Sequence, residues 1–248
     1  MAYTLDIKNM SWVENTENEV DFIIKTMGLN GNEKILDLGC GFGRHSLSFA
    51  KRGFNVVGVD LTEVFIDDAK NEAHKNNLKI EFIKDDVRNL KYNEEFDVVL
   101  NLANDLLGTM ETDEENLQLF NIISKALKKN GKHFMDIING EHADTYFPKK
   151  HWQIGTKKLS LPEFLWNRET KRYIYREWEV NFGEILEMRK EKLEDFSNEK
   201  GMRLYTKEEI GELLKERKME VVSTYSNYYG KKDSNKELQL IVYSRKEK

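Results

Sequence analysis

The fold of this chain is decided by residues 34–45, Lys-Ile-Leu-Asp-Leu-Gly-Cys-Gly-Phe-Gly-Arg-His. An apolar run typical of a buried strand leads into three alternate glycines, Gly39, Gly41 and Gly43, and then into the start of a helix. Glycine allows a sharp turn and a close approach of the backbone to a ligand, while the first turn of a helix presents unpaired N–H groups. This order of elements indicates an α/β protein with a ligand site at the end of the strand.

The spacing of the glycines distinguishes between cofactors. A dinucleotide site needs G-x-G-x-x-G, whereas the pattern here is G-x-G-x-G and position 44 is an arginine. The loop therefore favours S-adenosylmethionine over NAD. Asp37, near the end of the strand, is placed to bind the ammonium of the methionine part, and the N–H groups of the helix suit its carboxylate. A tight strand-to-helix turn without a ligand is the alternative interpretation.

Length and composition restrict the class of protein. A chain of 248 residues suits one large α/β domain, with or without a modest insertion. The formal charge of -5 offers no general attraction for nucleic acid or anionic lipid, so it disfavours those partners and favours a small molecule. The sequence predicts no metal site and does not specify the oligomeric state.

Cysteine content and the N-terminus indicate the compartment. Cys40 is the one cysteine, so no intrachain disulfide can form, and residues 1–6 lack the basic and apolar regions of a signal peptide. We therefore expect a cytoplasmic protein. No apolar run approaches the roughly 18–20 residues that span a bilayer, so we also expect no membrane contact.

Strand and helix patterns alternate over the first half of the chain. Because each crossover is long enough to hold a helix, residues 33–138 predict a doubly wound, mostly parallel sheet covered on both faces. The expected strands are Ile35–Leu38, Phe54–Val59, Ile80–Ile83, Phe96–Leu100 and Gly131–Ile138, and the expected helices are Asn15–Met27, Ser46–Arg52, one capped by Thr62, and Glu111–Lys128.

The pattern changes after Gly140. Residues 164–168, 171–180 and 184–193 alternate like strands and are separated by turn signals, which predicts antiparallel hairpins. A helix at 206–217, capped by Thr206, and strands at 219–225 and 237–243 then complete the first sheet. We therefore expect one α/β domain from residues 1–140 and 200–248, with a β-rich lid inserted at 141–199.

Two acidic signals follow the glycine loop in order. Asp60 comes directly after an apolar strand, where a carboxylate can accept hydrogen bonds from both hydroxyls of a ribose; NAD enzymes share this feature, and capping of the next helix is the alternative. Asp86 lies just past the third strand, where it could accept from an adenine amino group while the N–H of Val87 meets a ring nitrogen. For the Asp85–Asp86 pair alone, a solvated turn is an equal alternative.

Together these segments resemble the class I S-adenosylmethionine-dependent methyltransferases. The resemblance rests on residues 35–43, 57–60, 85–87 and 96–100 and is extended by Tyr205–Ile210. It implies a seven-stranded sheet with the last strand antiparallel, and S-adenosyl-L-homocysteine as the product. It also implies that Asp37, Gly39, Cys40 and Gly41 bind the methionine part, Asp60 and Leu61 the ribose, and Asp86 and Val87 the adenine, with Asn101 and Leu102 beside the sulfonium.

The acceptor is less well specified by the sequence. No Asn-Pro-Pro-Tyr tetrapeptide follows the fourth strand, where Asn101-Leu102-Ala103-Asn104 stands, which disfavours nucleobase or glutamine methylation by that arrangement. Methyl transfer from a sulfonium is an in-line displacement that depends mainly on alignment, so no catalytic residue is required, and none is identified. The possible acceptor contacts are Asn104, Asp105, Tyr175 and Arg176.

Three histidines are candidates for a general base. His45 belongs to the glycine-loop helix and His133 to a strand, and both favour structural roles, while His142 is open to either role. The leading hypothesis is methyl transfer to a nitrogen or oxygen of a small molecule. The alternatives are a non-catalytic S-adenosylmethionine-binding module, an NAD-dependent oxidoreductase and, less favoured, a nucleic-acid methyltransferase.

Overall fold

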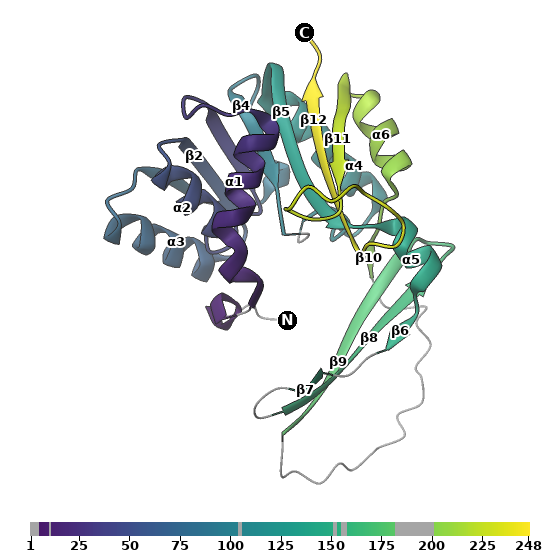
Figure 1. The fold of residues 1–248 in the computed structure, drawn as a ribbon. Helices are drawn as coiled ribbons and strands as arrows, with labels where there is room; N and C mark the ends of the chain where they lie inside the picture. Colours follow the sequence, from purple (N-terminus) through teal and green to yellow (C-terminus); the bar gives the residue numbers. More distant parts are fainter. Residues whose placement is uncertain (1–4, 10, 104–105, 151–152, 155–157, 182–200) are drawn as a thin grey trace.

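The computed structural model describes residues 5–9, 11–103, 106–150, 153–154, 158–181 and 201–248. They form a seven-stranded, mostly parallel sheet covered by helices and a smaller antiparallel sheet that extends away from it (Figure 1). This arrangement confirms the expected fold class. The strand order of the large sheet is β11-β12-β5-β4-β1-β2-β3. Its strands are β1 (Lys34–Leu38), β2 (Asn55–Asp60), β3 (Ile80–Lys84), β4 (Phe96–Asn101), β5 (Leu127–Ile138), β11 (Met219–Tyr225) and β12 (Gln239–Lys246).

The large sheet has a parallel part and an antiparallel edge. Strands β1, β2, β3, β4 and β5 pair in parallel, so their carboxyl ends meet at one edge. Strand β12 runs antiparallel to both β5 and β11, which confirms the antiparallel last strand. The ligand-binding edge of such a sheet is therefore the edge where β1, β2, β4 and β5 end.

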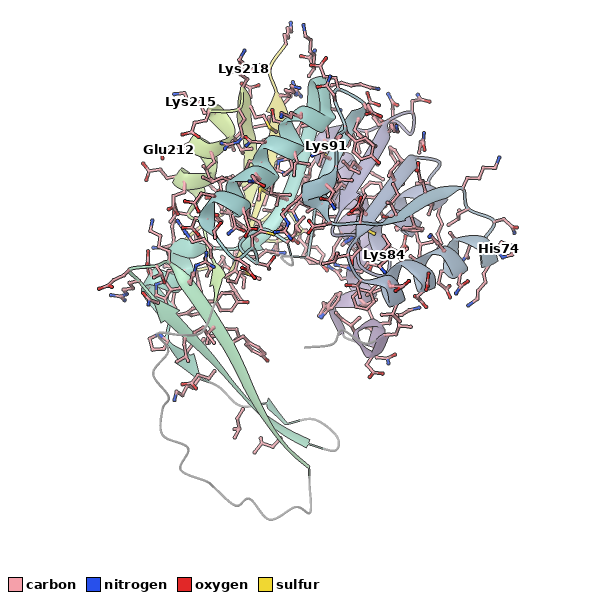
Figure 2. The ribbon with its side chains drawn as sticks, turned by 180° about the vertical axis from the view of Figure 1, so that it is seen from behind. His74, Lys84, Lys91, Glu212, Lys215 and Lys218 are labelled. Carbon is pink, nitrogen blue, oxygen red and sulfur yellow. The ribbon has the colours of Figure 1, made fainter. Side chains whose placement is uncertain are left out.

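Helices cover both faces of the large sheet. Helices α1, α2 and α3 lie on one face, while α4 and α6 lie on the other (Figure 1). Seen from behind, the labelled side chains of His74 on α3 and of Glu212 and Lys215 on α6 point away from the sheet (Figure 2). The apolar side of each helix thus packs on the sheet. The helices are α1 (Thr16–Met27), α2 (Arg44–Lys51), α3 (Glu63–Lys75), α4 (Asp113–Ala126) and α6 (Lys207–Lys215).

The expected helix caps differ in their bonds. Thr206 caps α6 with its hydroxyl, which accepts from the Glu209 N–H at 3.1 Å. Thr62 occupies the first position before α3 but makes no side-chain cap bond. Thr62 is thus the N-cap residue, as expected, but without the expected side-chain bond, while its own N–H donates to the Asp60 carboxylate at 2.8 Å.

The antiparallel sheet is built on one long hairpin. Strands β8 (Lys158–Asn167) and β9 (Arg172–Asn181) pair along their whole length, and Asn167 closes the turn by accepting from the Thr170 N–H at 3.1 Å. Strand β10 (Met202–Arg203) then pairs with β9. The expected strand at 184–193 lies outside the described residues. The shorter strands are β6 (Lys149–Lys150) and β7 (Gln153–Ile154), which both pair with β8.

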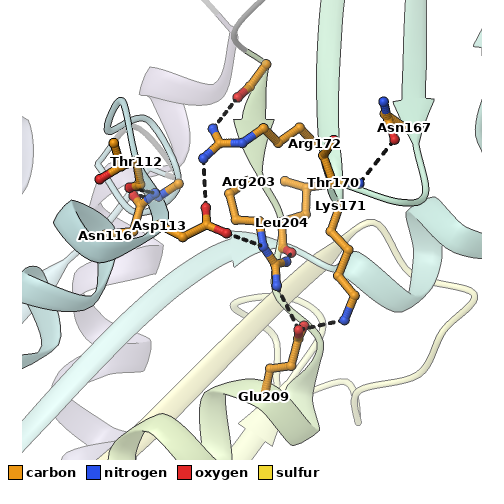
Figure 3. A network of polar contacts seen from close by, with 12 residues as sticks. Thr112, Asp113, Asn116, Asn167, Thr170, Lys171, Arg172, Arg203, Leu204 and Glu209 are labelled. Atoms are coloured by element: carbon orange, nitrogen blue, oxygen red, sulfur yellow. Dashed lines mark hydrogen bonds and ion pairs between the residues drawn. The ribbon is translucent and has the colours of Figure 1, made fainter. Parts of the chain in front are cut away.

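A polar network joins the turn end of the β8–β9 hairpin, called the hairpin base below, to two helices that cover the large sheet (Figure 3). Arg172 on β9 donates to Asp113 at the start of α4 at 2.7 Å. Lys171 and Arg203 both donate to the same carboxylate oxygen of Glu209 on α6, each at 2.7 Å. Side chains in the first turns of α4 and α6 therefore hold the start of β9 and the strand β10.

Four short helical elements were missed by the sequence interpretation. They are η1 (Leu5–Asn9), η2 (Ser11–Asn15), η3 (Val87–Asn89) and α5 (Gly140–Tyr146). Each is too short to show the helical periodicity of apolar residues over several turns. The cap of α5 was a usable signal, because Asn139 accepts from the Glu141 N–H at 3.0 Å.

Candidate cofactor and acceptor site

The glycine loop turns through three left-handed residues. Gly39, Gly41 and Gly43 have φ values of +70°, +55° and +77°, a conformation that side-chain-bearing residues rarely adopt. The N–H groups of Gly39 and Cys40 both donate to the Val59 carbonyl, at 2.8 and 3.0 Å. The end of β2 thus holds the loop in place.

Space around the loop differs between its glycines. A Cβ atom on Gly43 would lie 2.9 Å from Phe82 and 3.0 Å from Ala69, so this glycine is needed for packing. A Cβ atom on Gly41 would meet no protein atom within 4 Å. The open side of Gly41 therefore faces the space that a ligand could use.

Asp60 braces the glycine loop. Its carboxylate accepts from the Gly41 N–H at 2.9 Å with one oxygen and from the Thr62 N–H at 2.8 Å with the other. The bond from Thr62 agrees with the interpretation of Asp60 as a cap at the start of the next helix, while its predicted contact with a ribose stays a prediction. It lies beside the loop at the end of β2, followed by Leu61, which is exposed.

Asp37 lies buried near the end of β1. Its carboxylate accepts from the Ser46 hydroxyl of α2 at 2.6 Å, and the side chain is 2% exposed. Burial raises the pKa of Asp37, against the opposing effects of His45 and the Ser46 hydrogen bond. A cationic group placed beside it would offset this cost of burial.

A charged cluster that the sequence interpretation missed lies behind the loop. Glu19 on α1 accepts from Arg44 at 2.6 Å and contacts His45 Nε2 at 2.7 Å. The Arg44 guanidinium also lies 5.0 Å from the centre of the Trp12 ring. Glu19 stands beside Val20 and Ile23 on the buried side of α1, and a carboxylate at the border of an apolar stripe was the available signal.

The predicted adenine residues lie at the end of β3, beside β2. The Asp85 N–H donates to the Asp60 carbonyl at 3.1 Å, which joins the two strand ends. Asp86 is held by Arg88 at 2.5 Å, and this hydrogen bond lowers the pKa of the Asp86 carboxyl despite partial burial. Val87 is buried in the core under α4. An adenine amino group would therefore have to share the Asp86 carboxylate with Arg88.

The end of β4 carries one unsatisfied polar atom. Asn101 is 1% exposed, and its side-chain oxygen has no hydrogen-bond partner among the described residues. Buried polar atoms are rarely left unpaired, so this oxygen has unused capacity to accept a hydrogen bond, although Asn101 is not in the lining of either cavity described below. Leu102, the next residue, contributes to the wall of the loop cavity.

Two cavities adjoin at this edge of the sheet. The first follows the glycine loop and contains five predicted site residues. The second has a volume of about 380 Å³ and extends over the ends of β5 and β12. The two share Ile7, Trp12, Arg44 and Ala103. The first is lined by Asp37, Gly39, Cys40, Gly41 and Leu102, together with Phe42, His45, Phe65 and the four shared residues.

The predicted acceptor contacts do not meet in these cavities. Asn104 and Asp105 lie outside the described residues. Tyr175 is exposed and packs its ring 5.2 Å from that of Phe164, and it lines neither cavity. Arg176 follows it in β9, and its side chain is not among those described.

The candidate nucleophile and bases are buried or engaged. Burial, with the charges of Asp37 and Asp60, raises the pKa of the Cys40 thiol well above its usual range, so the thiol stays protonated. Burial lowers the pKa of His133 to about 3, and its ring contacts the Ser244 hydroxyl at 3.0 Å. His133 is therefore a neutral core residue.

A family model for a methyltransferase domain matches residues 35–131. A putative methyltransferase of Geobacillus sp. (strain WCH70) is 30% identical over 144 residues, 58% of this chain and 57% of the relative. A ubiquinone biosynthesis O-methyltransferase of Pelagibacter ubique is 39% identical over 108 residues, 44% of this chain and 43% of that protein. The chain thus spans about half the length of the curated relatives that it matches.

The fold extends the likeness to nearly the whole chain. The crystal structure of an S-adenosylmethionine-dependent methyltransferase from Clostridium acetobutylicum superposes with a TM-score of 0.73 at 18% identity, covering 98% of this chain and 97% of that one. The fold and the glycine-loop site define a Rossmann-like methyltransferase architecture. Residues 35–131 are therefore similar to a methyltransferase domain, and the fold of the whole chain is similar to that of this S-adenosylmethionine-dependent methyltransferase. Among the helices of the described residues, none combines the length and the apolar character that a bilayer-spanning segment requires.

Proposed function

We propose that this protein transfers a methyl group from S-adenosylmethionine to a nitrogen or oxygen atom of a small molecule. The observation that carries the proposal is the junction of two cavities, one along the glycine loop and one over the ends of β5 and β12. A donor and an acceptor bound in adjoining cavities can meet at their shared wall, which is what a direct transfer requires.

The residues present fit the cofactor. Asp37 would hold the ammonium of the methionine part, the open side of Gly41 leaves room beside the loop, and the unsatisfied oxygen of Asn101 would accept from a donor group. Asp60 and Leu61 would meet the ribose, and Asp86 with Val87 the adenine. The bound cofactor supplies a methyl group already activated on a sulfonium.

The main task of the protein is to orient the methyl donor and the acceptor and to exclude water from between them. Ile7 and Trp12, from the two short N-terminal helical elements, line both cavities. Apolar side chains at this junction keep solvent from the line of transfer, and the backbone of the loop determines where the methyl group lies. A small-molecule acceptor is in keeping with the similarity of part of this chain to the ubiquinone biosynthesis O-methyltransferase of Pelagibacter ubique.

Ligand binding tests this proposal and separates it from its rivals. S-adenosylmethionine or S-adenosylhomocysteine at a hundredfold excess over Kd should stabilise the protein by about 2.7 kcal/mol and raise the melting temperature by about 5–10 °C. NADH should produce no shift. Labelled methyl from the cofactor should then appear in a small-molecule metabolite fraction. The absence of any shift with both cofactor forms would contradict the proposal, whereas binding without transfer would favour a non-catalytic module.

A further inference from the structure

The second cavity, over the ends of β5 and β12, has two buried carboxylates in a mainly apolar wall. Glu19 is 6% exposed and Asp136 is 4% exposed. Arg44 is the one cation among the described residues of the wall, and Gln239 is the neutral polar one. The apolar part of the lining is made of Ile7, Trp12, Ala103, Ile137, Ile138 and Leu238.

Two carboxylates and one guanidinium line this wall. Glu19 is in contact with Arg44 at 2.6 Å and with His45 Nε2, just outside the wall, at 2.7 Å. Asp136 takes hydrogen bonds from two neutral donors, the Tyr228 hydroxyl and the Gln239 amide, the latter at 3.1 Å. With these three side chains ionised, two carboxylates face one guanidinium. A cationic ligand is therefore the kind that this wall favours.

Strand register places Asp136 beside the predicted site of transfer. Leu100 of β4 pairs with Asp37 on one side, and Asn101 pairs with Met135 of β5 on the other. Asp136 is therefore one position further along β5, level with Leu102. Because side chains alternate along a strand, it lies on the same face as Phe134, under α1. Asp37 and Asp136 thus approach the junction of the two cavities from different strands.

The surroundings of Asp136 keep its carboxylate in a defined orientation. Tyr228 is buried with its ring stacked near Phe134, and burial together with the Asp136 charge raises the pKa of its hydroxyl well above the usual range. Tyr228 therefore stays protonated and continues to donate. Burial also raises the pKa of Asp136, against the Tyr228 hydrogen bond, which makes this carboxylate a better proton acceptor than an exposed one.

We propose that the acceptor is a small amine with an apolar body, bound in this cavity with its nitrogen at Asp136. This inference rests on the proposed methyltransferase function and narrows its acceptor class. An amine arrives as an ammonium, which the negative wall attracts, while Trp12 and Leu238 contact its apolar part. A carboxylate of the same size would be repelled, and an alcohol would gain no charge pairing.

The transfer step balances in protons and electrons. The ammonium gives one proton to the Asp136 carboxylate and becomes a neutral amine. The nitrogen lone pair forms the new N–C bond as the C–S bond breaks, and the electron pair of that bond remains on sulfur as a neutral thioether. The product leaves as a methylated ammonium, and Asp136 returns its proton to solvent.

Binding of matched ligand pairs tests the inference without any variant. The probes are benzylamine, cyclohexylamine and n-butylamine, each compared with its alcohol, titrated into wild-type protein saturated with S-adenosylhomocysteine. We expect at least one amine to bind about tenfold more tightly than its alcohol, since a hydrogen bond between two charged groups is stronger than one from a neutral hydroxyl. Equal binding of every pair, or no amine binding, would overturn the inference.

A substitution locates the effect at Asp136. Asp136→Asn should remove the preference for the amine while S-adenosylhomocysteine affinity stays within about twofold, because the cofactor does not depend on this carboxylate. Glu163→Gln is the matched control, since Glu163 is 3% exposed in the antiparallel sheet and pairs with Lys150 outside the cavity. A retained amine preference in Asp136→Asn would reject the role of this residue.

The cofactor measurement keeps the two proposals apart. Binding of S-adenosylhomocysteine without amine preference would leave the methyltransferase proposal standing and remove the amine inference. Failure to bind S-adenosylhomocysteine at all would remove both. Mass spectrometry of the N-methyl product of a bound amine, formed from labelled S-adenosylmethionine, should supply the final confirmation, and a bound amine that stays unmethylated would reject the acceptor role.

Discussion

The two adjoining cavities at the carboxyl edge of the large sheet are assembled differently. The glycine-loop cavity takes much of its wall from the single stretch Asp37–His45. The cavity over the ends of β5 and β12 collects side chains from η1, η2, α1, α2, β5 and β12, between Ile7 and Gln239 in the chain. A site built from one local turn is visible in a sequence as a motif. A site built from distant segments has no such motif, because its residues meet only after folding.

The same difference should govern how the cavities respond to substitution. Within the glycine loop, single residues combine backbone conformation and ligand contact, so changes there should act on folding or on cofactor binding. In the cavity over the ends of β5 and β12, Asp136 and Leu238 lie outside the lining of the loop cavity, so changes there should alter ligand preference with little effect on the loop.

The largest effect is expected within the glycine loop itself. Gly43→Ala should destabilise the fold by about 2–4 kcal/mol, because its Cβ would crowd Phe82 and Ala69 in a left-handed conformation. Gly41→Ala, with no atom within 4 Å of the added Cβ, should cost only about 1 kcal/mol and instead weaken cofactor binding about tenfold. Urea unfolding and calorimetric titration distinguish the two outcomes. Equal stability of the two variants would contradict this division of roles.

Asp37→Asn should separate charge from packing. The asparagine can still accept from Ser46, so the melting temperature should be retained, while S-adenosylmethionine affinity should fall about 10- to 100-fold through loss of a charge-assisted bond. Isothermal titration measures the change. Asp97→Asn on β4, where Asp97 pairs with Lys128, is the control and should leave the affinity unchanged. Unaltered affinity in Asp37→Asn would remove Asp37 from the ammonium site.

The smallest effect is expected outside both cavities, at the base of the hairpin. Burial alone would raise the pKa of Glu209, but hydrogen bonds from Lys171, the Thr206 N–H and Arg203 outweigh it and lower the pKa to about 2 (Figure 3). A lowered folded-state pKa stabilises the protein above the ordinary value of 4.5, and this stabilisation is lost as pH falls from 4.5 to about 2. Glu209→Gln should therefore cost about 1–2 kcal/mol at pH 7, after allowance for solvent screening.

The pH dependence makes this a specific test. The stability difference between wild type and Glu209→Gln should shrink below pH 4.5 and vanish near pH 2, as followed by urea unfolding at several pH values. Cofactor and amine binding should be the same in both proteins. A difference that does not change with pH would show that the charge of Glu209 is not what stabilises the hairpin base.

Much of the fold could be predicted because its signals are local. The strands near Ile35 and Phe96 are short apolar runs between polar turns, and α1 shows a helical repeat over three turns. The helical elements that were missed are brief: η1, η2, η3 and α5 have too few residues for periodicity to appear. Two of these, η1 and η2, supply Ile7 and Trp12 to both cavities.

By itself, the sequence predicted the alternation of strands and helices that makes a parallel sheet, the glycine loop and the order of Asp37, Asp60 and Asp86, because each of these signals lies in residues close together in the chain. Only the tertiary structure decided that Asp136, Glu19 and Arg44 share the wall of the cavity next to that loop. The physical reason is that strand order and helix packing bring together residues more than a hundred positions apart, and a cavity's charge is a property of that assembly rather than of any one segment.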